Sequence, residues 1–136
     1  MDPSYSEQRQ APVVEAPKLK RKRILLADDQ PEVRETVKLL LCADQHSVSE
    51  AASGQEALSL FTPHRFDLVI TDYAMPGMRG DELANRIKQV APSQPILMIT
   101  GSAEQSDIHT AFVDAFLCKP FAFEDLRRAV ARLVAG

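Results

Sequence analysis

The sequence predicts a doubly wound α/β fold, in which helices cover both faces of a parallel sheet. Short apolar runs alternate along the chain with segments whose apolar residues have helical spacing. Most of these runs are continuously apolar, which is typical of strands that are buried on both faces. The chain has 136 residues, 45% of them hydrophobic, which is the size and composition of one domain with a proper core.

The first half of the chain predicts two strands and two helices. Residues 24–27 are continuously apolar and predict a strand, and Pro31 suits the first turn of the helix that follows. Residues 46–52 form a weaker run with two serines and a glutamate, which is typical of an edge strand. Residues 53–56 read as a capping box that opens a second helix, continuing through Phe61. The apolar positions of the first helix are Val33, Val37, Leu40 and Leu41.

The second half predicts three more strands. Residues 66–71 form the third apolar run, and a loop at 75–77 leads into the third helix. Residues 96–100 and 115–118 predict the fourth and fifth strands, but residues 102–112 between them offer a poor helical stripe. The apolar positions are Leu83, Ile87 and Val90 in the third helix, Ile108, Ala111 and Phe112 in the poor stripe, and Leu126, Val130, Leu133 and Val134 in the last helix.

Five strands alternating with five helices imply right-handed crossovers. With the weak strand at an edge, the expected topology is a flavodoxin-like (βα)5 fold with strand order 2-1-3-4-5. Such folds bind ligands where the strand order reverses, here between strands 1 and 3. These strands end at Asp28 and Asp72.

Residues 1–22 predict a disordered, basic, proline-containing tail, and residues 23–136 predict the folded domain. Residues 1–23 carry six basic and three acidic side chains, against ten basic and sixteen acidic in the remainder. The acidic balance of the domain argues against nucleic-acid binding by the domain itself. The basic cluster at 18–23 is read as a solvated linker, with a contact for an acidic partner or nucleic acid as the alternative.

The chain lacks both a signal peptide and an apolar segment near the ~18 residues that cross a membrane. We therefore expect a cytoplasmic protein with no membrane contact. Cys42 and Cys118 lie in apolar segments without metal-ligand spacing, so both are expected to be reduced packing residues.

Five polar residues stand at the carboxyl ends of the apolar runs: Asp28, Asp29, Asp72, Thr100 and Lys119. The carboxyl ends of parallel strands meet at one rim of the sheet, so these residues are expected to share a cleft. Two carboxylates ~4 Å apart repel by ~4 kcal/mol at an effective protein dielectric constant, and one lysine cannot balance three of them. The site is expected to need a divalent cation.

Each of these residues has an ordinary explanation on its own, as a helix cap, a turn residue or a strand terminus. Together they favour phosphoryl transfer, because Mg²⁺ prefers one or two carboxylates, waters and a phosphate oxygen. Asp72 would attack as a carboxylate and form an acyl phosphate, while Asp28 and Asp29 hold the metal. Thr100 and Lys119 would contact the phosphoryl oxygens.

Four segments carry a resemblance to a known family: residues 24–29 (ILLADD), 67–78 (DLVITDYAMPGM), 96–101 (ILMITG) and 116–121 (FLCKPF). They resemble the receiver domain of two-component response regulators, and the chain is similar to the stand-alone chemotaxis-type receivers. The resemblance extends from residue 23 to about residue 134, with all the motifs in order and suitably spaced.

The resemblance implies that Asp72 accepts a phosphoryl group from a histidine kinase or phosphotransfer protein. It also implies that Asp29, Asp72 and the backbone carbonyl of Ala74 bind Mg²⁺, with Asp28 acting mostly through water. Lys119-Pro120 matches the family's cis peptide, and Phe116 matches its aromatic switch position. Such a protein is not an enzyme beyond self-catalysed phosphorylation and dephosphorylation, for which the small Ala74 leaves water a path.

The chain departs from the family pattern in two places. The stretch from Thr100 to Lys119 is about one helical turn shorter than in the family, so the sequence does not settle whether the fourth helix forms. Phe116 lacks the hydroxyl of the common tyrosine, so a switch through Thr100 and Phe116 would act by packing alone. The target-binding face is expected on residues 102–112, the fifth strand and the last helix.

The residues bear on three alternative functions. A haloacid-dehalogenase-like phosphatase requires a second Asp two positions after the nucleophile. This chain has Ala74 there, which argues against that function. A flavin binder needs a phosphate loop after the first strand, where Asp28 and Asp29 would repel a phosphate. A phosphorylation-independent pseudo-receiver scaffold stays open. The expected state is a monomer or weak dimer, as a stand-alone regulator or a receiver excised from a larger protein.

Overall fold

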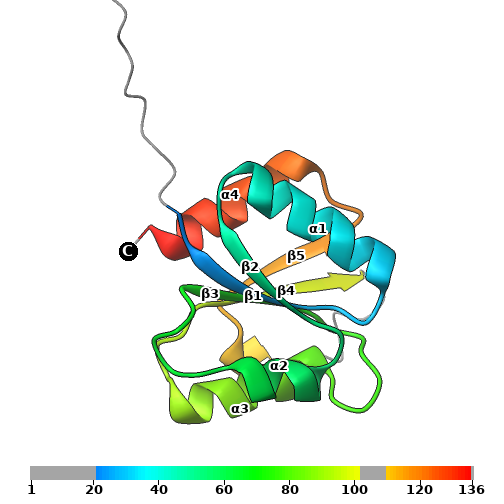
Figure 1. Ribbon diagram of the computed structural model, residues 1–136. Coiled ribbons are helices and arrows are strands. Elements are labelled where there is room, and N and C mark those ends of the chain that lie inside the picture. Colours follow the sequence, from blue (N-terminus) through cyan, green and yellow to red (C-terminus); the bar gives the residue numbers. More distant parts are fainter. Residues whose placement is uncertain (1–20, 102–109, 136) are drawn as a thin grey trace, which may run out of the picture.

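In the computed structural model, which describes residues 21–101 and 110–135, five strands form one parallel sheet (Figure 1). The strand order is β2-β1-β3-β4-β5, which confirms the predicted topology. The strands are β1 (Arg23–Ala27), β2 (Ser47–Ala51), β3 (Leu68–Asp72), β4 (Ile96–Gly101) and β5 (Ala115–Lys119). The weak strand β2 lies at an edge, because its polar residues do not require cover on both faces.

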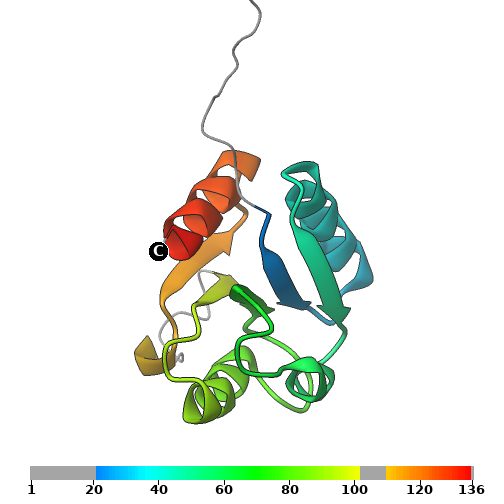
Figure 2. The same ribbon diagram turned by 60° about the vertical axis from the view of Figure 1, so that its left-hand side comes forward.

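Within the described residues, α-helices cover both faces of the sheet (Figures 1 and 2). The helices are α1 (Pro31–Ala43), α2 (Gly54–Leu60), α3 (Gly80–Val90) and α4 (Phe123–Val134). Successive strand residues point to opposite faces, so Leu26 packs in the cluster of α1 and α4, while Leu25 packs in that of α2 and α3. This arrangement explains why the central strands are continuously apolar.

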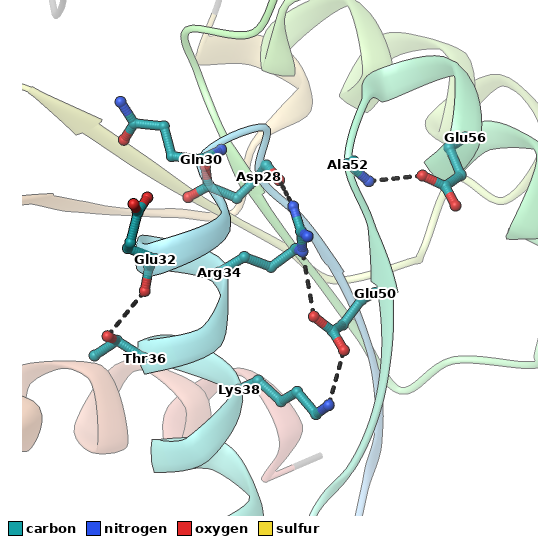
Figure 3. A network of polar contacts seen from close by, with 9 residues as sticks. All are labelled: Asp28, Gln30, Glu32, Arg34, Thr36, Lys38, Glu50, Ala52 and Glu56. Atoms are coloured by element: carbon teal, nitrogen blue, oxygen red, sulfur yellow. Dashed lines mark hydrogen bonds and ion pairs between the residues drawn. The ribbon is translucent and has the colours of Figure 1, made fainter.

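The helix starts follow the local sequence. Pro31 opens α1 at its first position. At α2, the N-cap Ser53 hydroxyl accepts a hydrogen bond from the Glu56 backbone N–H at 3.0 Å, which is one half of the predicted capping box. The Glu56 carboxylate in turn accepts from the backbone N–H of Ala52 at 2.7 Å (Figure 3).

Several predicted boundaries shift by a residue. Strand β2 begins at Ser47 because the His46 backbone N–H donates to Leu41 at the end of α1, and its ring accepts from the Lys22 backbone N–H. The Lys22 carbonyl, just before β1, accepts a hydrogen bond from the Ser47 backbone N–H at 2.9 Å. Helix α2 ends at Leu60, one residue before the predicted Phe61.

Two residues predicted to pack are exposed. Val90 is the last residue of α3 and is 60% exposed, because α3 contacts the core through Leu83 and Ile87 and ends before another turn is buried. Cys42 is exposed because it follows the buried Leu41 on α1, and successive helix residues point about 100° apart. Cys118 is half-buried, and neither cysteine forms a disulfide.

The described residues contain four α-helices and not the five that the sequence predicts. Residues 110–112 form a short 3-10 helix. The rest of the doubtful fourth helix, residues 102–109, and the predicted tail at residues 1–20 lie outside the described residues. None of the helices within 21–101 and 110–135 has the length and hydropathy needed to cross a membrane.

Gly80 allows the loop after β3 to fold back against the end of that strand. The Gly80 backbone N–H donates to the Tyr73 carbonyl at 2.9 Å. A Cβ atom at position 80 would overlap the carbonyl oxygen of Asp72 and lie 3.0 Å from the Tyr73 Cα. Only glycine therefore permits this approach of α3 to the end of β3.

We expect Gly80→Ala to lower the free energy of unfolding by about 2 kcal/mol, because the added methyl group pushes against backbone that cannot move aside cheaply. Urea denaturation followed by circular dichroism measures the loss. Gln89→Ala, on the exposed face of the same helix, serves as the control and should be close to neutral. A Gly80→Ala protein as stable as the control would show that the loop adapts freely.

Candidate functional site

Three carboxylates meet at the carboxyl ends of β1 and β3. Asp28 and Asp29 follow β1, and Asp72 ends β3, its neighbour in the sheet. One oxygen from each of these carboxylates lies within 4.8 Å of the others. The structure thus brings together the acidic residues that the sequence predicts at this rim.

Burial makes this cluster unfavourable when it is ionised. Asp28 is 1% and Asp72 4% exposed, while Asp29 is half-buried. Burial raises the pKa of the Asp28 carboxyl above its usual value, although a hydrogen bond from the Gln30 backbone N–H and the charge of Lys119 act against the shift. A raised folded-state pKa means that ionising Asp28 costs stability as the pH rises through that range.

Lys119 and Thr100 come from the two strands beyond β3. Lys119 ends β5, and its ammonium lies 2.8 Å from Oδ1 of Asp72. Thr100 lies near the end of β4 and is fully buried, and its hydroxyl donates to the Gly101 carbonyl at 3.1 Å. Within the described part of the chain, this ion pair therefore sets the Lys119 ammonium against a cluster of three carboxylates.

The cluster fits a hard divalent cation. Its donors are three carboxylate oxygens within 4.8 Å of one another, of which Asp28 is buried at a cost and Asp72 is paired with lysine. Mg²⁺ is commonly held by one or two carboxylates, with waters and phosphate oxygens completing its shell. The exposed Ala74 lies in the loop two residues after Asp72, where the family resemblance implies a backbone ligand.

Phe116 lies away from the acidic cluster, on β5. It pairs in register with Met98 and is 38% exposed. Its ring borders a shallow hollow of about 240 Å³ between β5 and α4, which Asp125, Arg128 and Arg132 also line. The structure therefore places the predicted aromatic switch residue at the surface, while its role stays a prediction.

Sequence reasoning missed three residues that shape the site. Arg34 on α1 donates to the backbone carbonyl of Asp28, and Glu50 on β2 accepts from Arg34 (Figure 3). In the sequence, Glu50 indicates only an edge strand, and the contact of Arg34 is marked only by its position six residues after Asp28. Gly80 is the third residue, and the sequence signal for it is a glycine between the 75–77 loop and the predicted third helix.

The model of the response regulator receiver domain family matches residues 24–131 of this chain. The chain belongs to this family. This membership excludes the haloacid-dehalogenase-like alternative. The Lys119-Pro120 peptide is cis, as the resemblance implied.

Among relatives, a gliding motility regulatory protein of Myxococcus xanthus is 38% identical over 128 residues, which are 90% of this chain and 16% of that protein. The nitrate/nitrite response regulator NarL of Escherichia coli K12 is 34% identical over 118 residues, which are 83% of this chain and 55% of NarL. The chain therefore spans only a sixth to about half of these curated relatives.

Among solved structures, a response regulator receiver domain protein from Clostridium thermocellum has a TM-score of 0.79 at 29% identity, over 83% of this chain and 94% of that one. The response regulator TrrA of Thermotoga maritima, in complex with Mg²⁺ and BeF, has a TM-score of 0.77 at 36% identity, over 82% and 98% of the two chains. Both likenesses support the receiver fold.

Proposed function

We propose that this receiver takes a phosphoryl group onto Asp72 from a phosphohistidine of a histidine kinase or phosphotransfer protein. The observation that carries the proposal is the position of Asp72, which joins the acidic cluster and pairs with Lys119 at 2.8 Å. A carboxylate held by a lysine beside two further carboxylates suits an attack on a phosphoryl group.

In the proposed step, a carboxylate oxygen of Asp72 attacks the phosphorus, and the N–P bond breaks with its electron pair returning to the imidazole. The product on this chain is an acyl phosphate. Lys119 then pairs with one phosphoryl oxygen, and the Thr100 hydroxyl donates to another. Both residues already lie at the carboxyl ends of adjacent strands, Thr100 one residue before the end of β4 and Lys119 at the end of β5.

Asp29, Asp72 and the carbonyl of Ala74 would hold Mg²⁺, and Asp28 would act through water. When bound, Mg²⁺ supplies positive charge that offsets the phosphoryl oxygens and the crowded carboxylates. TrrA, which is similar over most of this chain, forms a complex with Mg²⁺ and BeF, and this supports the assignment. We place the protein in the cytoplasm as a monomer or weak dimer.

Signal output would follow through Thr100 and Phe116 to a protein target on β5, α4 and residues 102–112, of which 102–109 lie outside the described residues. Thr100 and Phe116 come from adjacent strands, so a shift of the buried threonine can change the packing beside the ring. The exposed Phe116 ring and its charged surroundings on α4 would form part of the contact.

The proposal predicts that phosphorylation depends on a divalent cation. The wild-type chain is incubated with a small phosphodonor such as acetyl phosphate, with Mg²⁺ or with excess chelator, and its intact mass is measured. We expect one phosphoryl group with Mg²⁺ and at least ~100-fold slower labelling without it, because uncompensated carboxylates repel the donor. No adduct in either condition would favour the pseudo-receiver scaffold instead.

A further inference from the structure

Arg34 on α1 reaches the turn that carries the two aspartates after β1. Its Nη1 donates to the backbone carbonyl of Asp28 at 2.7 Å, and its Nε donates to the Glu50 carboxylate at 3.2 Å (Figure 3). The Arg34 side chain is only 19% exposed, so these contacts are partly protected from water. The guanidinium therefore ties the acidic turn to both α1 and β2.

Glu50 is itself fixed from a second direction. Its other carboxylate oxygen lies 2.8 Å from the ammonium of Lys38, one turn along α1 from Arg34. Contacts with Lys38 and Arg34 hold the pKa of the Glu50 carboxyl below its usual value, so this carboxyl is ionised at neutral pH. Glu50 thus orients the guanidinium as well as neutralising it.

Asp28 is restrained at three of its polar atoms. Its backbone N–H donates to the Ala51 carbonyl at 3.1 Å, and its Oδ1 accepts from the Gln30 backbone N–H at 2.9 Å. The contact from Arg34 to the Asp28 carbonyl is the third restraint and the only one of these made by a side chain from outside the turn. It fixes the peptide that joins Asp28 to Asp29.

We propose that Arg34, oriented by Glu50, is a positioning residue that holds the Asp28–Asp29 turn so that its carboxylates converge on Asp72. The inference rests on the proposed Mg²⁺ site. Mutual repulsion pushes the three carboxylates apart, and the turn needs a restraint to keep them within 4.8 Å before a cation arrives. Outer contacts of this kind commonly set the affinity of a metal site.

The sign of the change in Mg²⁺ affinity distinguishes positioning from a plain charge effect. Removing a nearby cation should by itself tighten Mg²⁺ binding, because like charges repel. Loss of a positioning residue should weaken it. We expect Arg34→Ala to raise the Mg²⁺ dissociation constant roughly tenfold, measured by isothermal titration calorimetry without any phosphodonor.

Further variants separate the contributions. Arg34→Lys can reach one partner but not both and should recover only part of the affinity. Lys38→Ala removes one contact of Glu50 but leaves the Arg34 contact with Asp28 in place, so its Mg²⁺ dissociation constant should lie between those of the wild type and Arg34→Ala. Arg127→Ala breaks a bidentate ion pair with Asp44 that links α4 to the end of α1. This variant tests whether a loss of stability alone weakens Mg²⁺ binding. We expect its Mg²⁺ affinity to equal that of the wild type.

Circular dichroism establishes that each variant is folded at the titration temperature. Should Arg34→Ala unfold, Arg34→Lys carries the test. If the Arg34 variants bind Mg²⁺ as tightly as the wild type or more tightly, the role of Arg34 is overturned while the proposed metal site stands. Weakening by Arg127→Ala to the same degree also overturns it, since stability would then explain the effect. A wild-type chain that binds no Mg²⁺ overturns the metal site and this inference together.

Discussion

Asp72→Asn is expected to abolish phosphorylation. The substitution keeps the size of the side chain but replaces the attacking carboxylate with an amide, which is a far weaker nucleophile. It also removes the charge that the Lys119 ammonium contacts at 2.8 Å. Incubation with acetyl phosphate and Mg²⁺, followed by intact mass measurement, should show one added phosphoryl group on the wild type and at least ~1000-fold slower labelling of the variant.

Asp67→Asn is the matched control for this experiment. Asp67 precedes the first residue of the same strand, at the opposite end from Asp72, where it contacts Arg23. The control therefore makes the same chemical change in the same strand without altering the acidic cluster. It should be labelled like the wild type. Undiminished labelling of Asp72→Asn would show that another residue accepts the phosphoryl group.

The acidic site was predictable because parallel-sheet geometry alone makes strand ends converge. Asp28, Asp72 and Lys119 each follow an apolar run, and strand order follows from the one weak run at 46–52. No pairwise contact had to be known in advance. The ion pair from Lys119 to Asp72 and the clustering of Asp29 with them then follow from that convergence.

The supporting contacts were not predictable in the same way. Whether Arg34 reaches Asp28 or Glu50 depends on how α1 lies across β2, and an apolar stripe fixes only which face of the helix is buried. The need for glycine at position 80 arises from a loop that doubles back onto Asp72, which periodicity does not encode. At 102–112 the sequence has no periodic signal strong enough to specify a helix.

Asp29→Asn is expected to have opposite effects on stability with and without Mg²⁺. Without metal, removing one of three crowded charges relieves repulsion worth about 1 kcal/mol for a half-exposed carboxylate, which raises the melting temperature by roughly 4 °C. With Mg²⁺, the wild type gains stability by mass action, since the cation binds only the folded cluster. The variant lacks a proposed ligand and should lose most of that gain.

Thermal unfolding by circular dichroism, with chelator and with saturating Mg²⁺, measures both effects on the same two proteins. Glu32→Gln is the control, because it removes an exposed negative charge from the first turn of α1 outside the cluster. It should keep the full Mg²⁺-induced rise and should lose slight stability, since an acidic residue favours a helix N-terminus. A metal-free Asp29→Asn protein that melts at or below the wild-type temperature would show that the carboxylates do not strain the fold, and the argument for a cation from charge crowding would fail with it.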